Sequence, residues 1–139
     1  MNQVASTNIY QAIGGEAAVR QLATRFYEIM DELPEAYALR QIHPESLEGS
    51  TQTLFEFLSG WLGGPSLYQA KHGHPRLRMR HFPYSIDQDK RNEWMLCMRL
   101  ALNEVVQDEG LRMALHQAFS QMADHMINAS PVVAGAVKA

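Results

Sequence analysis

Three of the six histidines of this 139-residue chain fall in one short basic stretch, residues 71–83. His81 lies one helical turn after Leu77, and Pro83 would end any helix just beyond it. A neutral imidazole is the commonest metal ligand and the usual proximal ligand of haem iron. Because long amphipathic segments lie on both sides of this stretch, we expect His81 to be a ligand to a group held in the core.

The other charged residues of the stretch leave alternatives open. His72 and His74 could join His81 around a metal ion, but no carboxylate or thiol converges on them in sequence. The arginines of the stretch suit a solvated face, a nucleic-acid patch, or charge pairing with an anionic group in the core. The net charge of -3 and the lack of interleaved aromatic residues argue against nucleic acid as a partner.

Composition limits the class of protein. A hydrophobic fraction of 46% and a charged fraction of 19% are typical of one globular domain at this length. Cys97 is the only cysteine, so no internal disulfide can form, and its expected place on an apolar stripe suggests a core residue. No apolar run is long enough to span a bilayer, and the first residues lack a signal-peptide core. We therefore expect a cytoplasmic protein with no membrane partner.

Helical periodicity supplies the elements that must position these residues. A turn at Gly14-Gly15 precedes the first long helix, which opens at Glu16 and ends before Pro34. Its apolar stripe comprises Val19, Leu22, Ala23, Phe26, Tyr27 and Met30. Tyr27 is unusual because a buried hydroxyl needs a partner. The simplest partner is a backbone carbonyl, as in an ordinary core tyrosine.

Three further helices follow. One begins at Leu47, stops at 63–65, and is expected to bury Leu54, Phe57, Leu58 and Trp61 on one face. Residues 66–73 are expected to be mostly loop. A helix capped by Ser85 or Asp87 carries the stripe Trp94, Cys97, Met98, Ala101, Leu102 and Val105. The last, after a break at 108–110, ends near Asn128 and carries Leu111, Leu115, Ala118, Phe119, Met122, Ala123 and Met126.

This pattern predicts an all-α fold without strands, built from about four substantial helices. We expect an N-terminal extension at 1–8, one domain at 9–128 and a tail at 129–139. If the core holds a haem, its apolar walls can come from a set of large side chains on three of these helices. They are Leu54, Phe57, Leu58, Met98 and Met126.

The chain resembles the group II truncated haemoglobins in two segments, GWLGGP at 60–65 and GHPRLRMRH at 73–81. The Gly14-Gly15 pair, Arg25-Phe26-Tyr27 and Trp94 match the same family. The resemblance covers residues 9–128. It implies a two-over-two α-helical sandwich with haem b in its core, and a very short proximal helix of about one turn within a long loop.

The resemblance also implies roles for individual residues. His81 is similar to the proximal iron ligand, and Tyr27 to the distal tyrosine that donates a hydrogen bond to a diatomic ligand. Trp94 resembles the indole that closes the distal pocket. Ser50 and Leu54 match the two distal-helix positions that face the ligand, and the histidine often found at the first of them is absent here. His43 occupies a corner position that is often Phe or Tyr in the family, so it departs from the pattern; it could add a third hydrogen-bond donor or change pocket access with pH.

The edge of the haem site is expected to include several further residues. Arg80 is the first choice for pairing with a propionate, and His74 and Tyr68 are weaker candidates. The Nδ1–H of His81 is expected to donate to a backbone carbonyl near Leu77. Tyr27 and Trp94 remain open to an ordinary core role, because large apolar residues at helical spacing are usually core.

The implied activity is reversible binding of dioxygen and other diatomic ligands such as carbon monoxide and nitric oxide. The alternative is a haem enzyme that oxidises nitric oxide to nitrate or reduces peroxide. Since the sequence contains no flavin or nicotinamide domain, sustained turnover would need an external reductase. A haem-free structural bundle is the third class, and an absorption spectrum would separate it from the other two.

Overall fold

The computed structural model describes residues 8–76, 81 and 84–128, and every regular element in these ranges is helical. The two helices nearest the N-terminus are α1 (Ile9–Ile13) and α2 (Gly15–Glu32). A 3₁₀ turn, η2 (Pro34–Ala36), leads into α3 (Tyr37–Gln41). The remaining elements are α4 (Glu48–Trp61), α5 (Leu67–His72), α7 (Gln88–Val105) and α8 (Glu109–Met126). The predicted all-α class is confirmed.

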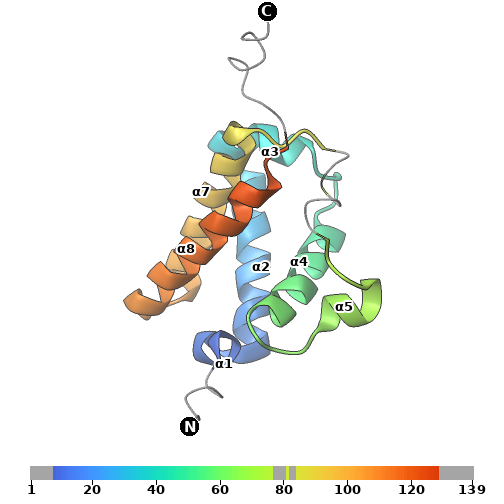
Figure 1. The fold of residues 1–139 in the computed structure, drawn as a ribbon. Coiled ribbons are helices and arrows are strands. Elements are labelled where there is room, and N and C mark those ends of the chain that lie inside the picture. Colours follow the sequence, from blue (N-terminus) through green and yellow to red (C-terminus); the bar gives the residue numbers. More distant parts are fainter. Residues whose placement is uncertain (1–7, 77–80, 82–83, 129–139) are drawn as a thin grey trace, which may run out of the picture.

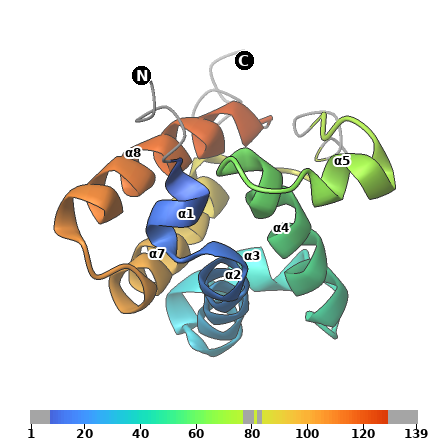
Figure 2. The same ribbon diagram turned by 90° about the horizontal axis from the view of Figure 1, so that it is seen from below.

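Four long helices form two pairs that share one core. Helix α2 packs against both α4 and α7, and α7 packs against α8. In Figure 1, α7 and α8 lie on one side of α2 and α4 and α5 lie on the other. Seen from below, in Figure 2, α1 crosses in front of the bundle. This arrangement is the two-over-two sandwich that the family resemblance implies.

Helix α2 is the central element and follows its predicted stripe closely. All six predicted positions are buried, and Ile29 is buried with them. The helix begins after a sharp turn in which Gly14 has φ 124° and Gly15 has φ 73°, values that only glycine adopts without strain. On its outer face Arg25 bridges to α7, donating to both carboxylate oxygens of Glu104 at 2.6 and 2.9 Å.

Two aspartates start the last two long helices. Asp87 accepts a hydrogen bond from the Lys90 backbone N–H, which confirms one of the two predicted caps for α7. Asp108 accepts from Gly110 N and Leu111 N and opens α8, at the break expected from sequence. Helix α8 ends at Met126, and Asn128 follows two residues later. The frame between α7 and α8 is tightened by Arg91, which pairs with Asp124 at 2.8 Å.

The buried face of α4 differs from the expected one. Leu58 is fully buried as predicted, but Leu54 and Phe57 are half-buried and Trp61 is 36% exposed. The other buried residues of this helix are Phe55, Glu56 and Ser59. The additional buried residues are explained because α4 contacts two elements at once, α2 and α5. A single-stripe reading cannot describe a helix covered from two directions.

Residues 66–73 were expected to be mostly loop, and this is wrong, because 67–72 form helix α5. Tyr68 is buried, with its ring centroid 6.3 Å from that of Phe57 on α4. At the last turn, Lys71 Nζ and His72 Nε2 lie 3.1 and 3.3 Å from the Glu56 carboxylate. Since these contacts are tertiary contacts with the preceding helix, local helix propensity gives no sign of them.

No helix in the described part of the chain is long and apolar enough to cross a membrane.

Candidate functional site

Tyr27 lies on the buried face of α2 and belongs to the hydrophobic core, with 9% of its surface exposed. Its hydroxyl makes no hydrogen bond to any residue at 8–76, 81 or 84–128, so the expected backbone carbonyl partner is not found among them. Burial raises the pKa of this phenol, which therefore keeps its proton. A buried O–H donor without a protein partner is rare in native structures and is a feature of ligand sites.

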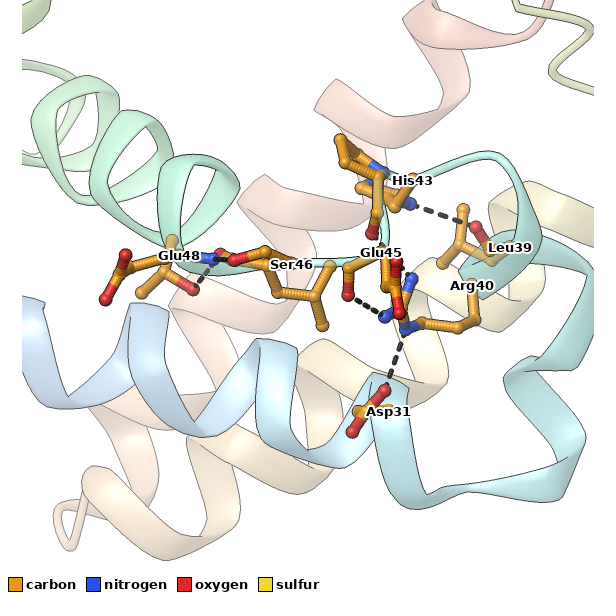
Figure 3. Close-up of polar contacts among 10 residues, drawn as sticks. Asp31, Leu39, Arg40, His43, Glu45, Ser46 and Glu48 are labelled. Atoms are coloured by element: carbon orange, nitrogen blue, oxygen red, sulfur yellow. Dashed lines mark hydrogen bonds and ion pairs between the residues drawn. The ribbon is translucent and has the colours of Figure 1, made fainter.

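His43 lies next to Tyr27, at the corner after α3, with the two ring centroids 5.6 Å apart. Its Nδ1 is 2.9 Å from the Leu39 carbonyl oxygen, as Figure 3 shows. Because a carbonyl can only accept, Nδ1 carries the proton and Nε2 carries the lone pair of a neutral ring. Burial is the main cause that lowers the pKa of His43, and the charges of Arg40 and His81 act in the same direction. The neutral ring is thus favoured.

The corner that carries His43 is fixed by its neighbour Arg40. The Arg40 guanidinium pairs with Asp31 of α2 at 2.8 Å and donates to the carbonyl oxygens of Pro44 and Glu45 at 2.9 and 2.7 Å (Figure 3). These bonds connect α3 to α2 and to the residues that directly follow His43. The position of His43 relative to Tyr27 is therefore set by a local network rather than by a flexible loop.

Trp94 of α7 belongs to an aromatic series that crosses the interior. Its ring centroid lies 5.0 Å from Phe26 and 5.8 Å from Phe119. Phe26 in turn meets Tyr27 edge-on at 4.9 Å, and Phe119 lies 4.8 Å from Trp61. Trp94 is half-buried, and its indole N–H makes no hydrogen bond within the described residues. Because Phe26 contacts both rings, the indole N–H of Trp94 is a second hydrogen-bond donor in the same part of the interior as Tyr27.

The predicted apolar walls occupy positions of different burial. Leu58 and Met98 are fully buried, whereas Leu54, Phe57 and Met126 are half-buried. Ser50, one turn before Leu54 on α4, is also half-buried. Leu54 and Phe57 pack against the hydrophobic core from α4.

Tyr68 of α5 and the histidines His72 and His74 lie in different surroundings. Tyr68 is buried and its ring lies 4.5 Å from that of His72. His74 is exposed, and its Nδ1 accepts a hydrogen bond from the Arg76 backbone N–H at 3.1 Å. No group of three or more residues suited to holding a metal ion occurs among the described residues. His72 is instead engaged with Glu56.

His81 is half-buried and its backbone is held firmly. Its carbonyl oxygen accepts from the Tyr84 N–H at 3.0 Å and from the Asn128 side-chain amide at 3.1 Å. The predicted residues Leu77 and Arg80 lie outside the described residues, so the carbonyl acceptor and the propionate contact stay predictions. The roles of His81, Tyr27, Trp94 and His43 stay predictions as well.

Two polar residues beside the site were missed by the sequence reasoning. Glu56 has 7% of its side chain exposed and accepts from Gln52, Lys71 and His72. Its signal in the sequence is an acidic residue between Phe55 and Phe57 on an amphipathic helix, which requires a partner when buried. Asn128 carries no comparable signal, because all its partners lie more than forty residues earlier.

Comparison with known proteins identifies the family. The family described as Bacterial-like globin matches residues 8–128. A group 2 truncated hemoglobin, YjbI of Bacillus subtilis (strain 168), is 37% identical over 119 residues, covering 86% of this chain and 87% of the relative. Among solved structures, a cold-adapted truncated hemoglobin from the Antarctic bacterium Pseudoalteromonas haloplanktis TAC125 is 51% identical, with a TM-score of 0.87 and coverage of 88% of this chain and 98% of the other. A truncated oxygen-avid haemoglobin from Bacillus subtilis is 36% identical, with a TM-score of 0.80 and coverage of 88% and 100%.

Globins of this family carry haem b, and the described residues suit it. The hydroxyl of Tyr27 and the indole N–H of Trp94 are donors without a partner in the described chain, as a pocket for a further group requires. Half-buried apolar side chains on α4 and a half-buried imidazole at position 81 suit the macrocycle and its iron. The chain belongs to the group II truncated haemoglobins, within the Bacterial-like globin family, and its cofactor is haem b.

Proposed function

We propose that this globin reversibly binds dioxygen and other diatomic ligands, with His81 as the proximal iron ligand and Tyr27 as the principal distal donor. Haem b, when bound, supplies an iron centre with an open position for a small ligand. The observation that carries the proposal is the buried Tyr27 hydroxyl, which has no partner in the described chain. Burial keeps this donor protonated, so it is ready to donate whenever a ligand with partial negative charge arrives.

Trp94 and His43 complete the proposed distal side in different ways. The indole N–H of Trp94 can only donate, so it suits the same negatively polarised ligand as Tyr27. Neutral His43 has its one N–H committed to the Leu39 carbonyl and offers only a lone pair at Nε2. A donor role for His43 toward the ligand therefore requires the protonated ring.

The proposed cofactor-holding residues fall into one group on the long helices and a second group at the opposite side or the edge of the macrocycle. Ser50, Leu54 and Phe57 on α4 would contact the macrocycle from the distal side, with Leu58, Met98 and Met126 behind or beside them. Leu77, Arg80, His74 and Tyr68 would contact the opposite side or the edge. Small Ser50 leaves the ligand to Tyr27 and Trp94. The apolar members would exclude water and so strengthen each hydrogen bond that Tyr27 makes.

A spectrum of the purified holoprotein tests the proposal. Ferrous and ferric spectra with and without carbon monoxide should show a haem with one histidine ligand and an exchangeable second position. His81→Ala should lose normal haem retention, whereas the matched variant His116→Ala, on α8, should keep the wild-type spectrum. An unaltered spectrum in His81→Ala would remove this residue as the ligand.

A second candidate function is enzymatic. The observation that favours it is that two donors, the Tyr27 hydroxyl and the Trp94 indole N–H, have no partner among residues 8–76, 81 and 84–128. Donors that retain dioxygen suit a reaction with nitric oxide, in which both oxygen atoms enter nitrate and one electron must be supplied for each turnover. Peroxide reduction to water needs two electrons and two protons. In both cases an external reductase is required. With a supplied reductase, formation of many nitrate molecules per haem would favour this candidate, because the ferrous protein without a reductase can give only one.

A further inference from the structure

Asn128 makes four hydrogen bonds to the segment that contains His81. Its side-chain Nδ2 donates to the carbonyl oxygens of His81 at 3.1 Å and Tyr84 at 3.0 Å. Its Oδ1 accepts from the Ile86 N–H at 2.8 Å, and its own backbone N–H donates to the Ile86 carbonyl at 2.9 Å. Both amide protons and the amide oxygen of one side chain are therefore used on a single segment.

The base from which Asn128 reaches this segment is rigid. It follows α8 by two residues, and α8 is anchored in the core through Leu115, Phe119 and Ala123. Arg91 also ties the first turn of α7 to α8, through Asp124 and the Ser120 side chain and backbone. The end of α8 and the start of α7 lie together at one end of the bundle (Figure 1). Asn128 and the residues that it binds are therefore attached to two helices, α8 and α7, that are themselves bonded to each other.

The contact at His81 is made to its backbone, not to its ring. The carbonyl oxygen of His81 accepts from both Tyr84 N–H and Asn128 Nδ2, which occupies both of its lone pairs. Fixing the carbonyl restricts the backbone at this residue and hence the direction in which its side chain leaves the chain. A metal ligand needs such support, because a small error in ring orientation weakens its bond to the metal.

We propose that Asn128 is a positioning residue that sets the orientation of His81 toward the iron from the far end of the sequence. This inference rests on the proposed role of His81 as the proximal ligand. Asparagine fits because it provides two donors and one acceptor on a short side chain. Aspartate would keep the acceptor for Ile86 but place a negative oxygen against the carbonyls of His81 and Tyr84.

The test uses the holoprotein and two variants. Asn128→Asp loses both donors, and Asn128→Ala loses all three side-chain bonds without adding charge. Resonance Raman spectra of the ferrous, ligand-free protein report the iron–histidine stretching band, and transfer of haem to an excess of apomyoglobin reports the dissociation rate. Both variants should shift or broaden the band and lose haem about tenfold faster, the factor that corresponds to about 1.4 kcal/mol.

Controls separate positioning from general stability. Asn103→Asp makes the same chemical change at an exposed position of α7 and should leave the band and the haem loss unchanged. If Asn128→Asp does not fold, Asn128→Ala decides the question. A wild-type band in Asn128→Ala overturns the proposal, even if haem loss is faster, because the contact would then only stabilise the segment. A wild-type iron–histidine band in His81→Ala would instead refute the role of His81 and thus the proposed function.

Discussion

Replacing Tyr27 with Phe should have opposite effects on ligand retention and on the stability of the haem-free protein. The substitution removes one oxygen atom from a side chain that is 9% exposed and leaves the packing against Phe26 and His43 in place. A hydrogen bond to a negatively polarised partner contributes about 1.5 to 3 kcal/mol, so dioxygen should dissociate roughly ten- to a hundredfold faster.

The effect on stability follows because the structure, over the residues that it describes, gives the Tyr27 hydroxyl no hydrogen-bond partner. A buried polar group left unsatisfied costs about 1 to 3 kcal/mol. Because the Tyr27 hydroxyl has no partner in the described chain, its removal should raise the free energy of unfolding of the haem-free protein, by about 1 kcal/mol or more. A hydroxyl with an ordinary structural partner would give the reverse sign.

Two measurements and one control decide the matter. Stopped-flow displacement of dioxygen by carbon monoxide gives the dissociation rate, and urea denaturation followed by circular dichroism gives the unfolding free energy. Tyr10→Phe, a half-buried tyrosine of α1, should change neither quantity strongly. An unchanged dissociation rate in Tyr27→Phe would refute the hydrogen bond to the ligand. Lower stability of the haem-free variant would show that the hydroxyl has an internal partner.

Three other substitutions test the frame around the site. Asp108→Ala removes the cap of α8 and should destabilise the protein by about 1 kcal/mol in urea, whereas Asp108→Asn should retain most of the stability. Gly64→Ala would place a methyl group in the Tyr10 ring and should cost about 1 to 3 kcal/mol, while Gly49→Ala, with open space on α4, should be neutral or stabilising; equal effects at the two glycines would contradict the close approach. The hydrogen bond from Gln52 is the main cause that lowers the pKa of Glu56 below its ordinary 4.5, followed by those from Lys71 and His72. The Glu56 carboxylate therefore stabilises the folded protein above that pH, and this stabilisation is lost as the pH falls through the lower pKa of the folded state. Glu56→Gln should therefore flatten the acid limb of the stability–pH curve, and an unchanged acid limb would remove Glu56 as its source.

Periodicity predicted those parts of the fold that depend on one stripe facing one core. The six apolar positions of α2 are all buried, and the Asp87 cap of α7 follows directly from residue type and spacing. Helix α5 could not be found in the same way. It depends on Glu56 and Phe57 of α4, which bind its last turn and cover Tyr68.

The site shows the same division between residue type and placement. Tyr27, His43, Trp94 and His81 were selected from their types and from the family resemblance. The sequence could not predict the proton position or the hydrogen-bond partners of each group. The bond from His43 Nδ1 to Leu39 O lies within one turn, yet only the folded corner shows which nitrogen carries the proton. The four bonds of Asn128 depend on the meeting of two segments that are remote in sequence.

The aromatic series through the interior also gives the protein two optical probes with separate environments. The chain has two tryptophans, and both rings pack against Phe119, Trp61 at 4.8 Å and Trp94 at 5.8 Å. Trp61 is 36% exposed at the end of α4, whereas Trp94 is half-buried beside Phe26. Fluorescence of the haem-free protein therefore combines a more solvated and a more shielded indole. Replacing either tryptophan with Phe leaves one fluorescent indole. Haem binding should quench the fluorescence of that indole to an extent that depends on its distance from the haem, so each variant reports haem entry from one tryptophan position.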